Sequence, residues 1–314
     1  MSDLLNTQDL QEFAPDAVDS IDQSSVEGGG PSYPSIQYHY GNATLKKVGG
    51  MDYQGGFVIK DGAISSELLT AAGWTKTTWA HDTGTEDDVW WKREIAVSVI
   101  AQRKRWEVTP ETGPRLTFAW GAFDKAKEAG RPSGRTHYLV LVKGMEEAGP
   151  FVLTLKGSAG RAFEDYRDAK SVITKFSNTV IRAANNASDA AAKKAGKPTG
   201  KRWAFRAFWL PVGAARDEKG EPVFVEVGSG KETKKCCLPV ALGLPDKPEQ
   251  VDLKRFYVGN DLLQLVNALF DQSSEWRTAW ENIKPGSVEG GDAAAVEERA
   301  EKDAEDAALA ATGL

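Results

Sequence analysis

The sequence predicts an α+β protein that is mostly β, built as an OB-like barrel or a curved antiparallel sheet with one main inserted helix. The first observation is that short segments rich in aromatic and β-branched residues recur between turn residues along most of the chain. The second is that apolar residues recur every three or four positions within residues 158–194, the period of an amphipathic helix. An OB-like barrel carries its helix between its third and fourth strands, and such barrels bind oligonucleotides on one curved sheet face.

Several segments are expected to form strands, because each is rich in β-branched and aromatic residues and ends near a turn residue. They cover residues 35–40, 55–59, 89–108, 115–120, 137–142, 151–156, 201–210, 222–227 and 234–240. The longest of them has Ile95, Val97 and Val99 on one face, which we expect to be buried. The polar segment 121–134 is expected to be a surface loop or a short helix.

Helices are expected both between these strands and after them. A short helix over residues 65–72 is followed by Gly73, which is typical of a helix C-terminus. Two more helices are expected near the C-terminal end, one over residues 260–270 and one that starts near Ser273. The second of these carries Trp276 and Trp280, and their four-residue spacing predicts that both pack into the core.

The charge is divided unevenly along the chain. Residues 1–30 contain seven acidic residues and no lysine or arginine, and residues 285–314 contain eight acidic residues against one arginine and one lysine. The net charge of -6 is therefore made up of -7 and -6 at the two ends and +7 between them. We expect a flexible acidic arm over residues 1–30, a folded basic body over residues 31–284 and a disordered acidic tail over residues 285–314.

The expected strand 201–210 is the first candidate for a binding surface. Its alternating side chains would place Trp203, Phe205 and Trp209 on one face and Arg202, Arg206 and Phe208 on the other. Arginines among exposed rings are typical of a surface for single-stranded nucleic acid, because rings stack on bases and cations lie along phosphates. The alternative is a core strand whose rings are buried. The candidate binding residues are Arg202, Trp203, Phe205, Arg206, Phe208 and Trp209.

A second candidate contact lies at the far end of the expected strand 89–108. Arg103, Lys104, Arg105 and Trp106 form a basic run there with one aromatic ring. This run is either a contact for phosphate groups or a solvated strand end. Because only one face of each strand can be exposed, some residues of both stretches must belong to the core.

No catalytic or metal-binding signature is present in the sequence. His39, His81 and His137 are isolated, and Cys236 and Cys237 are too few for a zinc site. We therefore expect a protein that is not an enzyme and that needs no metal or cofactor. The chain has no signal-peptide pattern and no run of roughly 20 apolar residues, which predicts a cytoplasmic protein without membrane contact.

Four short segments carry a family resemblance. They are Tyr-Pro-Ser-Ile-Gln-Tyr at 33–38, Gly-Gly-Phe-Val at 55–58, Phe-Val-Leu-Thr-Leu-Lys-Gly at 151–157 and Ala-Phe-Trp-Leu-Pro at 207–211. The chain resembles a family of uncharacterised phage and mobile-element proteins over about residues 31–260. A basic body with an acidic tail is also similar to phage single-stranded DNA-binding proteins, in which the tail mimics nucleic acid and recruits replication partners. Residues 310–314 depart from that pattern, because they include no phenylalanine.

The sequence predicts a single-stranded DNA-binding protein without sequence preference, and the resemblance implies that it acts in the replication or recombination of a phage or mobile element. The expected partners are single-stranded DNA or RNA, replication or recombination proteins that contact the acidic tail, and further copies of the chain. The acidic tail is expected to compete with nucleic acid for the basic body. The alternative is a structural or assembly protein of a phage or mobile element that binds no nucleic acid.

Overall fold

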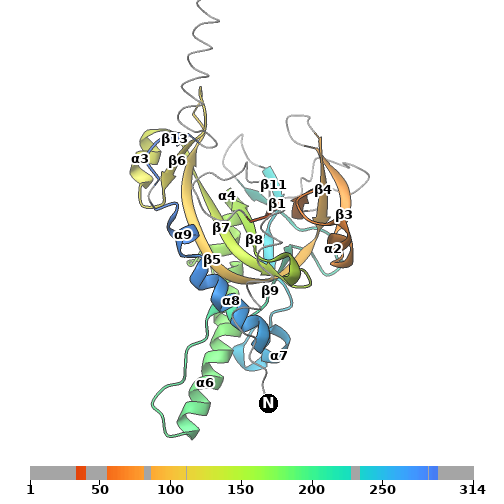
Figure 1. Ribbon diagram of the computed structural model, residues 1–314, viewed down its shortest axis with the longest axis vertical. Helices are drawn as coiled ribbons and strands as arrows, with labels where there is room; N and C mark the ends of the chain where they lie inside the picture. Colours follow the sequence, from red (N-terminus) through yellow and green to blue (C-terminus); the bar gives the residue numbers. More distant parts are fainter. Residues whose placement is uncertain are drawn as a thin grey trace, which may run out of the picture.

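The computed structural model describes residues 33–39, 55–80, 86–110, 112–227, 234–281 and 283–288. It confirms the predicted class: the protein is a mixed α+β structure with a large curved sheet (Figure 1). Over the described residues the sheet does not close into a barrel, so of the two predicted forms the curved sheet is the one observed. The predicted arm, residues 1–30, and most of the predicted tail lie outside the described residues.

The strands form where β-branched and aromatic residues cluster between turns. They are β1 (Ser35–His39), β2 (Gly56–Lys60), β3 (Thr75–Ala80), β4 (Glu86–Lys92), β5 (Glu94–Val108), β6 (Leu116–Ala119), β7 (Pro132–Val142), β8 (Phe151–Lys156), β9 (Leu210–Ala214), β10 (Phe224–Val227), β11 (Lys234–Cys237), β12 (Pro239–Ala241) and β13 (Ser287–Val288). The predicted strand 89–108 is thus divided between β4 and β5 at Arg93.

β5, with 15 residues, is the strand that holds the far end of the sheet together, and the main path of the sheet runs β12-β9-β5-β7-β8-β1-β2-β4-β3. β5 pairs along its length with β7, at its start with β9 and at its far end with β6. β6 in turn pairs with β13, so the far end of β5 is flanked by β7 on one edge and by β6 and β13 on the other. Within β5 the register shifts between Val99 and Ala101, which marks a bulge.

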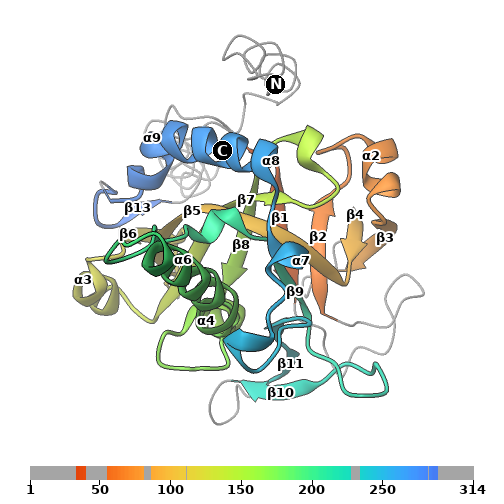
Figure 2. The same ribbon diagram turned by 90° about the horizontal axis from the view of Figure 1, so that it is seen from below.

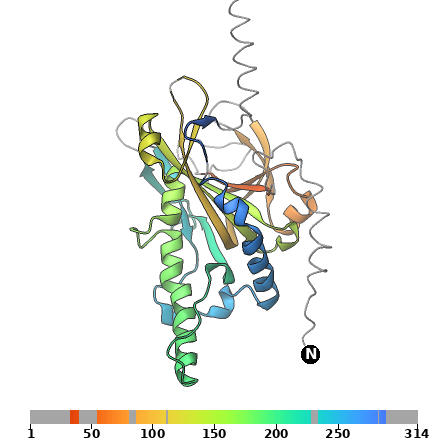
Figure 3. The same cartoon turned by 60° about the vertical axis from the view of Figure 1, so that its left-hand side comes forward.

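The helices lie on both sides of this sheet. They are α2 (Ser66–Ala71), α3 (Phe123–Glu128), α4 (Gly157–Glu164), α5 (Val172–Phe176), α6 (Arg182–Lys194), α7 (Leu253–Phe256), α8 (Asn260–Gln272) and α9 (Ser274–Thr278). The predicted main helix is therefore α4, a turn, and then the continuous run of α5, the π-helix η3 (Ser177–Ile181) and α6. α6 extends well beyond the sheet (Figure 1, Figure 3). None of the described helices is both long enough and apolar enough to cross a membrane.

Strand alternation divides the core between the two faces of the sheet. Tyr138 and Val140 of β7 pack in the cluster that includes Phe163 of α4, whereas Leu139 and Leu141 pack with residues of α8 and α9. Figure 2 shows α8 and α9 on one side of β5 and α4 and α6 on the other. Beyond the bulge, successive residues of β5 therefore present their side chains alternately to these two sides.

The predicted strand 201–210 is wrong. Residues 201–204 have no regular structure, residues Phe205–Ala207 form the 3-10 helix η4, and β9 begins only at Leu210. The physical reason is that the backbone finds partners outside a ladder: Ser98 Oγ donates to the Arg206 carbonyl at 2.7 Å, and the Trp209 N–H donates to the Phe256 carbonyl at 2.7 Å.

Candidate nucleic-acid interface

The rings expected to form a platform around residue 205 are mostly core residues. Phe208 and Trp209 are 2% and 5% exposed, and Phe205 is half-buried with its ring 4.9 Å from that of Phe176. Large rings that are covered on both faces cannot stack on a base. The prediction that Phe208 and Trp209 bind nucleic acid is therefore wrong, because both rings are buried, whereas the role of the half-buried Phe205 stays a prediction.

The other three candidate residues of this stretch, Arg202, Trp203 and Arg206, contact different parts of the protein. The exposed Arg202 forms an ion pair with Asp189, with 2.8 Å between Nη1 and Oδ2. The Arg206 guanidinium lies 4.2 Å from the centre of the Phe270 ring and its Nε donates to Asn267. Trp203 is partly exposed and meets Phe208 edge-on at 5.6 Å. Arg202 and the Trp203 backbone therefore contact α6, whereas Arg206 contacts α8.

The second predicted contact, residues 103–106, lies on β5 as expected, and the strand sends its members to opposite faces. Arg103 and Arg105 face α9, where both guanidinium groups lie over the Trp280 ring. Lys104 and Trp106 face the α4 side, toward Glu164 and Trp120. One basic run in the sequence therefore contributes to two separate surfaces.

On the α4 side, two tryptophans form a parallel stack. The rings of Trp106 and Trp120 are 4.1 Å apart at an interplanar angle of 7°, and Phe123 lies 4.9 Å from Trp106. Trp120 and Phe123 are each 43% exposed and Tyr166, nearby, is 67% exposed. We call Lys104, Trp106, Trp120, Phe123 and Tyr166 the aromatic surface.

The local sequence explains why the two rings meet there. Trp106 stands opposite Gly134 of β7 in the sheet register, and a β-carbon at Gly134 would lie 3.3 Å from the Trp120 ring and 3.4 Å from the Trp106 ring. The missing side chain thus makes room for the stack. β6 ends at Ala119, so Trp120 falls in the turn before α3, and its carbonyl accepts a 2.7 Å hydrogen bond from Trp106 Nε1.

A buried carboxylate fixes the rest of the aromatic surface. Glu164 lies 2.9 Å from Lys104 Nζ and accepts hydrogen bonds from the hydroxyls of Tyr138, at 2.5 Å, and Tyr166. Lys104 Nζ is held 5.5 Å from the Trp120 ring and 5.7 Å from the Tyr166 ring. Burial of the hydroxyl and its bond to Glu164 raise the pKa of Tyr166 to about 12, so this ring is neutral at physiological pH.

Sequence reasoning found Lys104 and Trp106 and missed Trp120, Phe123 and Tyr166. Trp120 was assigned to the end of a strand and Tyr166 to the apolar face of a helix. The position of Trp120 in the sequence could have indicated that its ring is exposed. Trp120 precedes Gly121, where an expected strand ends and a polar segment begins. An aromatic residue at such a turn has no neighbouring strand to cover its outer face.

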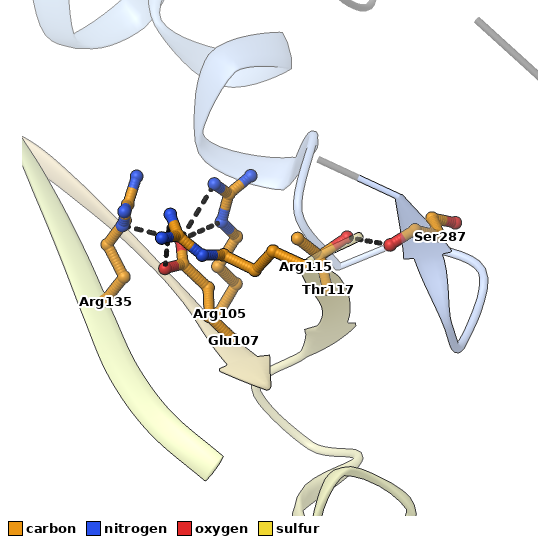
Figure 4. A network of polar contacts seen from close by, with 6 residues as sticks. All are labelled: Arg105, Glu107, Arg115, Thr117, Arg135 and Ser287. Atoms are coloured by element: carbon orange, nitrogen blue, oxygen red, sulfur yellow. Dashed lines mark hydrogen bonds and ion pairs between the residues drawn. The ribbon is translucent and has the colours of Figure 1, made fainter. Parts of the chain in front are cut away.

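The opposite face of the same strand ends carries a cluster of arginines (Figure 4). Buried Glu107 lies 2.9 Å from Arg105, 2.5 Å from Arg135 and 3.8 Å from Arg115. Arg103 completes the group, with its guanidinium 4.4 Å from the Trp276 ring and 4.3 Å from the Trp280 ring. We call Arg103, Arg105, Arg115 and Arg135, together with Glu107, the arginine cluster. Trp276 and Trp280 are buried, as predicted from their spacing.

Burial and the positive charges of the arginine cluster lower the pKa of two groups, Arg103 and His137. Burial, and then the charge of Arg105, lower the pKa of Arg103 to about 10. Burial, and then Arg103, Arg105 and Arg135, hold the pKa of His137 well below its usual range, so His137 is neutral at pH 7. In the described parts of the chain, no three His, Cys, Asp or Glu side chains gather where they could hold a metal ion. That the protein needs no metal and is no enzyme stays a prediction.

The arrangement joins an exposed aromatic stack to a lysine on one face of the sheet and gathers arginines on the other. Comparison with known proteins adds no independent assignment, so the predicted resemblance to phage proteins stays a prediction. No protein-family model, no curated protein and no solved structure matches this chain.

Proposed function

We propose that this protein binds single-stranded nucleic acid, with bases stacked on the aromatic surface. The observation that carries the proposal is the parallel pair of Trp106 and Trp120, whose outer ring is 43% exposed and has an ammonium group beside it. Stacking of a base on an exposed ring is worth roughly 1–3 kcal/mol and does not depend strongly on which base is present.

The chemistry of this surface favours single strands over duplexes. In a duplex the faces of the bases are already stacked on their neighbours, so only an unpaired base can lie flat on Trp120. The hydrogen bond from Trp106 Nε1 to the Trp120 carbonyl and the Lys104–Glu164 ion pair hold the surface in place before binding. A preformed surface loses little conformational entropy when it binds.

Charge supports the same proposal. Between the two acidic ends the sequence carries a charge of +7, which attracts the phosphates of either DNA or RNA. Lys104 is paired with Glu164, so this lysine contributes through its position between two rings more than through net charge. Binding without strong sequence dependence is expected, because stacking and phosphate attraction are shared by all sequences.

A titration with single-stranded and duplex oligonucleotides of the same mixed sequence tests the proposal. We expect tighter binding of the single strand, and affinity that falls with salt with a log–log slope of about -0.7 for each phosphate neutralised. Absence of binding at low salt, or a clear preference for the duplex, would overturn it.

One observation supports the alternative function, a structural or assembly protein. Val223 and Val225 are partly exposed beside the two-stranded sheet of β10 and β11, where another chain could pack. Self-association that is lost on Val225→Lys, together with no binding of nucleic acid, would favour this alternative.

A further inference from the structure

The arginine cluster is a second charged region of the protein, and the proposed stacking of bases on the aromatic surface does not involve it. It brings three guanidinium groups, those of Arg105, Arg115 and Arg135, to one buried carboxylate, Glu107, and Arg103 lies beside them over the Trp280 ring. The side chains of Arg105 and Arg135 are 12% and 17% exposed, and that of Arg115 is 37% exposed, so the cluster opens toward solvent at Arg115. Charges of one sign in such a partly buried place favour an anionic group next to them.

The last described strand, β13, lies beside the arginine cluster. β13 pairs antiparallel with β6, with Ser287 opposite Thr117 and Val288 opposite Leu116, and Thr117 Oγ1 donates to the Ser287 carbonyl at 3.0 Å (Figure 4). Figure 3 shows β13, in dark blue, beside this end of the sheet. In an antiparallel pair the next residue along one strand meets the preceding residue of the other. The residue after Val288 is Glu289, and the residue before Leu116 is Arg115.

We infer that the acidic segment 289–314 of the same chain docks on the arginine cluster. Its length and charge fit: it has eight acidic residues against Arg299 and Lys302, beginning with Glu289 and Asp292 directly after β13. An extended chain covers up to about 3.3–3.6 Å per residue, so the first few residues of the segment can reach all of the cluster. Carboxylates pair with guanidinium groups through two parallel hydrogen bonds, which suits an accessible Arg115.

Two features make this occupant more suitable than a separate partner. The connection to β13 keeps the acids at a high effective concentration near the cluster, so that weak ion pairs suffice to hold them. The cluster also lies on the face of β5 opposite the aromatic surface, so docking there leaves the Trp106–Trp120 stack accessible. The inference does not depend on nucleic-acid binding.

The test is chemical modification of arginine side chains by phenylglyoxal in the full chain, mapped by mass spectrometry. The parent is compared with a tail-neutral variant, in which the eight acids become amides: Glu289→Gln, Asp292→Asn, Glu297→Gln, Glu298→Gln, Glu301→Gln, Asp303→Asn, Glu305→Gln and Asp306→Asn. These substitutions leave every residue of the arginine cluster unchanged. We expect Arg115 to react about fivefold faster in the variant, which corresponds to a docked fraction of about four-fifths in the parent.

Arg167, which lies on the α4 side with a 92% exposed side chain, is the matched control and should react equally fast in both proteins. Raising the salt concentration should speed modification of Arg115 in the parent and not in the variant. Equal rates at Arg115 in the two proteins at low salt would overturn the inference. Protection that disappears on dilution would also overturn it, because it would assign the docked segment to another copy.

Discussion

The two faces of the far end of β5 are built from one run of sequence and differ in almost every physical property. On the α4 side, Trp106 and Lys104 reach a stack of rings that is open to solvent. On the α9 side, the guanidinium groups of Arg103 and Arg105 lie over the Trp280 ring, and Arg105 also pairs with Glu107. The difference shows that a basic and aromatic run on a strand does not define one binding site, because alternate residues belong to different surfaces.

Exposure separates the roles of the two faces further. Rings that stay open cost the fold little when they are removed, whereas a buried carboxylate among arginines is needed to offset their mutual repulsion. Substitutions on the α4 side should therefore change binding, and substitutions at Glu107 should change stability. The following predictions test that separation.

The largest effect is expected at a tryptophan that belongs to neither face. Trp209→Ala should lower the free energy of unfolding by roughly 3–5 kcal/mol, because its ring is 5% exposed in the core beside α8. The measurement is urea denaturation, followed by a binding titration under conditions where the variant is folded. A stable Trp209→Ala protein that has lost affinity for single strands would instead make this ring part of the binding site.

The next effect is expected at Glu107. Glu107→Gln should lower the free energy of unfolding by about 3 kcal/mol, because it leaves neighbouring guanidinium groups without their shared carboxylate. Thermal and urea unfolding measure the change, with Glu147→Gln, an exposed carboxylate, as the control. Equal stability of the Glu107→Gln variant and the parent would show that the arginine cluster does not need this charge.

The smallest effect concerns the acidic tail and nucleic acid. The tail-neutral variant should bind single strands about two- to fivefold more tightly at low salt, since the tail's negative charge no longer competes with phosphates for the basic body. The gain should disappear as salt screens the charges. An unchanged affinity across the salt range would limit the tail to solubility or to contacts with other proteins.

The sequence predicted the class of fold and most strands, because β-branched and aromatic residues follow strand periods closely in β2, β5 and β8. It failed at residues 201–210, where aromatic content indicated a strand. There the backbone turns at Phe205–Ala207 to place Phe208 and Trp209 in the core. Such a turn depends on contacts with residues 256–258 and with β5, which a local pattern does not contain.

The residues of the candidate site could be predicted only in part, because local sequence patterns do not contain contacts between separate elements. Lys104 and Trp106 were identifiable because they lie on a long regular strand, but their partners come from separate elements. Trp120 arrives through the β6–α3 turn, Tyr166 through the turn after α4, and the space for the rings through Gly134. No spacing in the sequence links these three positions, because the pairing of β5 with β6 and β7 places Trp120 and Gly134, and the contacts of Glu164 place Tyr166.

One pair of variants tests the central claim most directly, that bases stack on the aromatic surface. Trp120→Ala removes the exposed ring and keeps the backbone carbonyl that Trp106 Nε1 requires, and Trp203→Ala removes a partly exposed ring elsewhere. In fluorescence-anisotropy titrations with a single-stranded oligonucleotide, Trp120→Ala should lose roughly 1–3 kcal/mol of binding free energy at an unchanged melting temperature, and Trp203→Ala should bind like the parent. A folded Trp120→Ala protein with the affinity of the parent would contradict the claim.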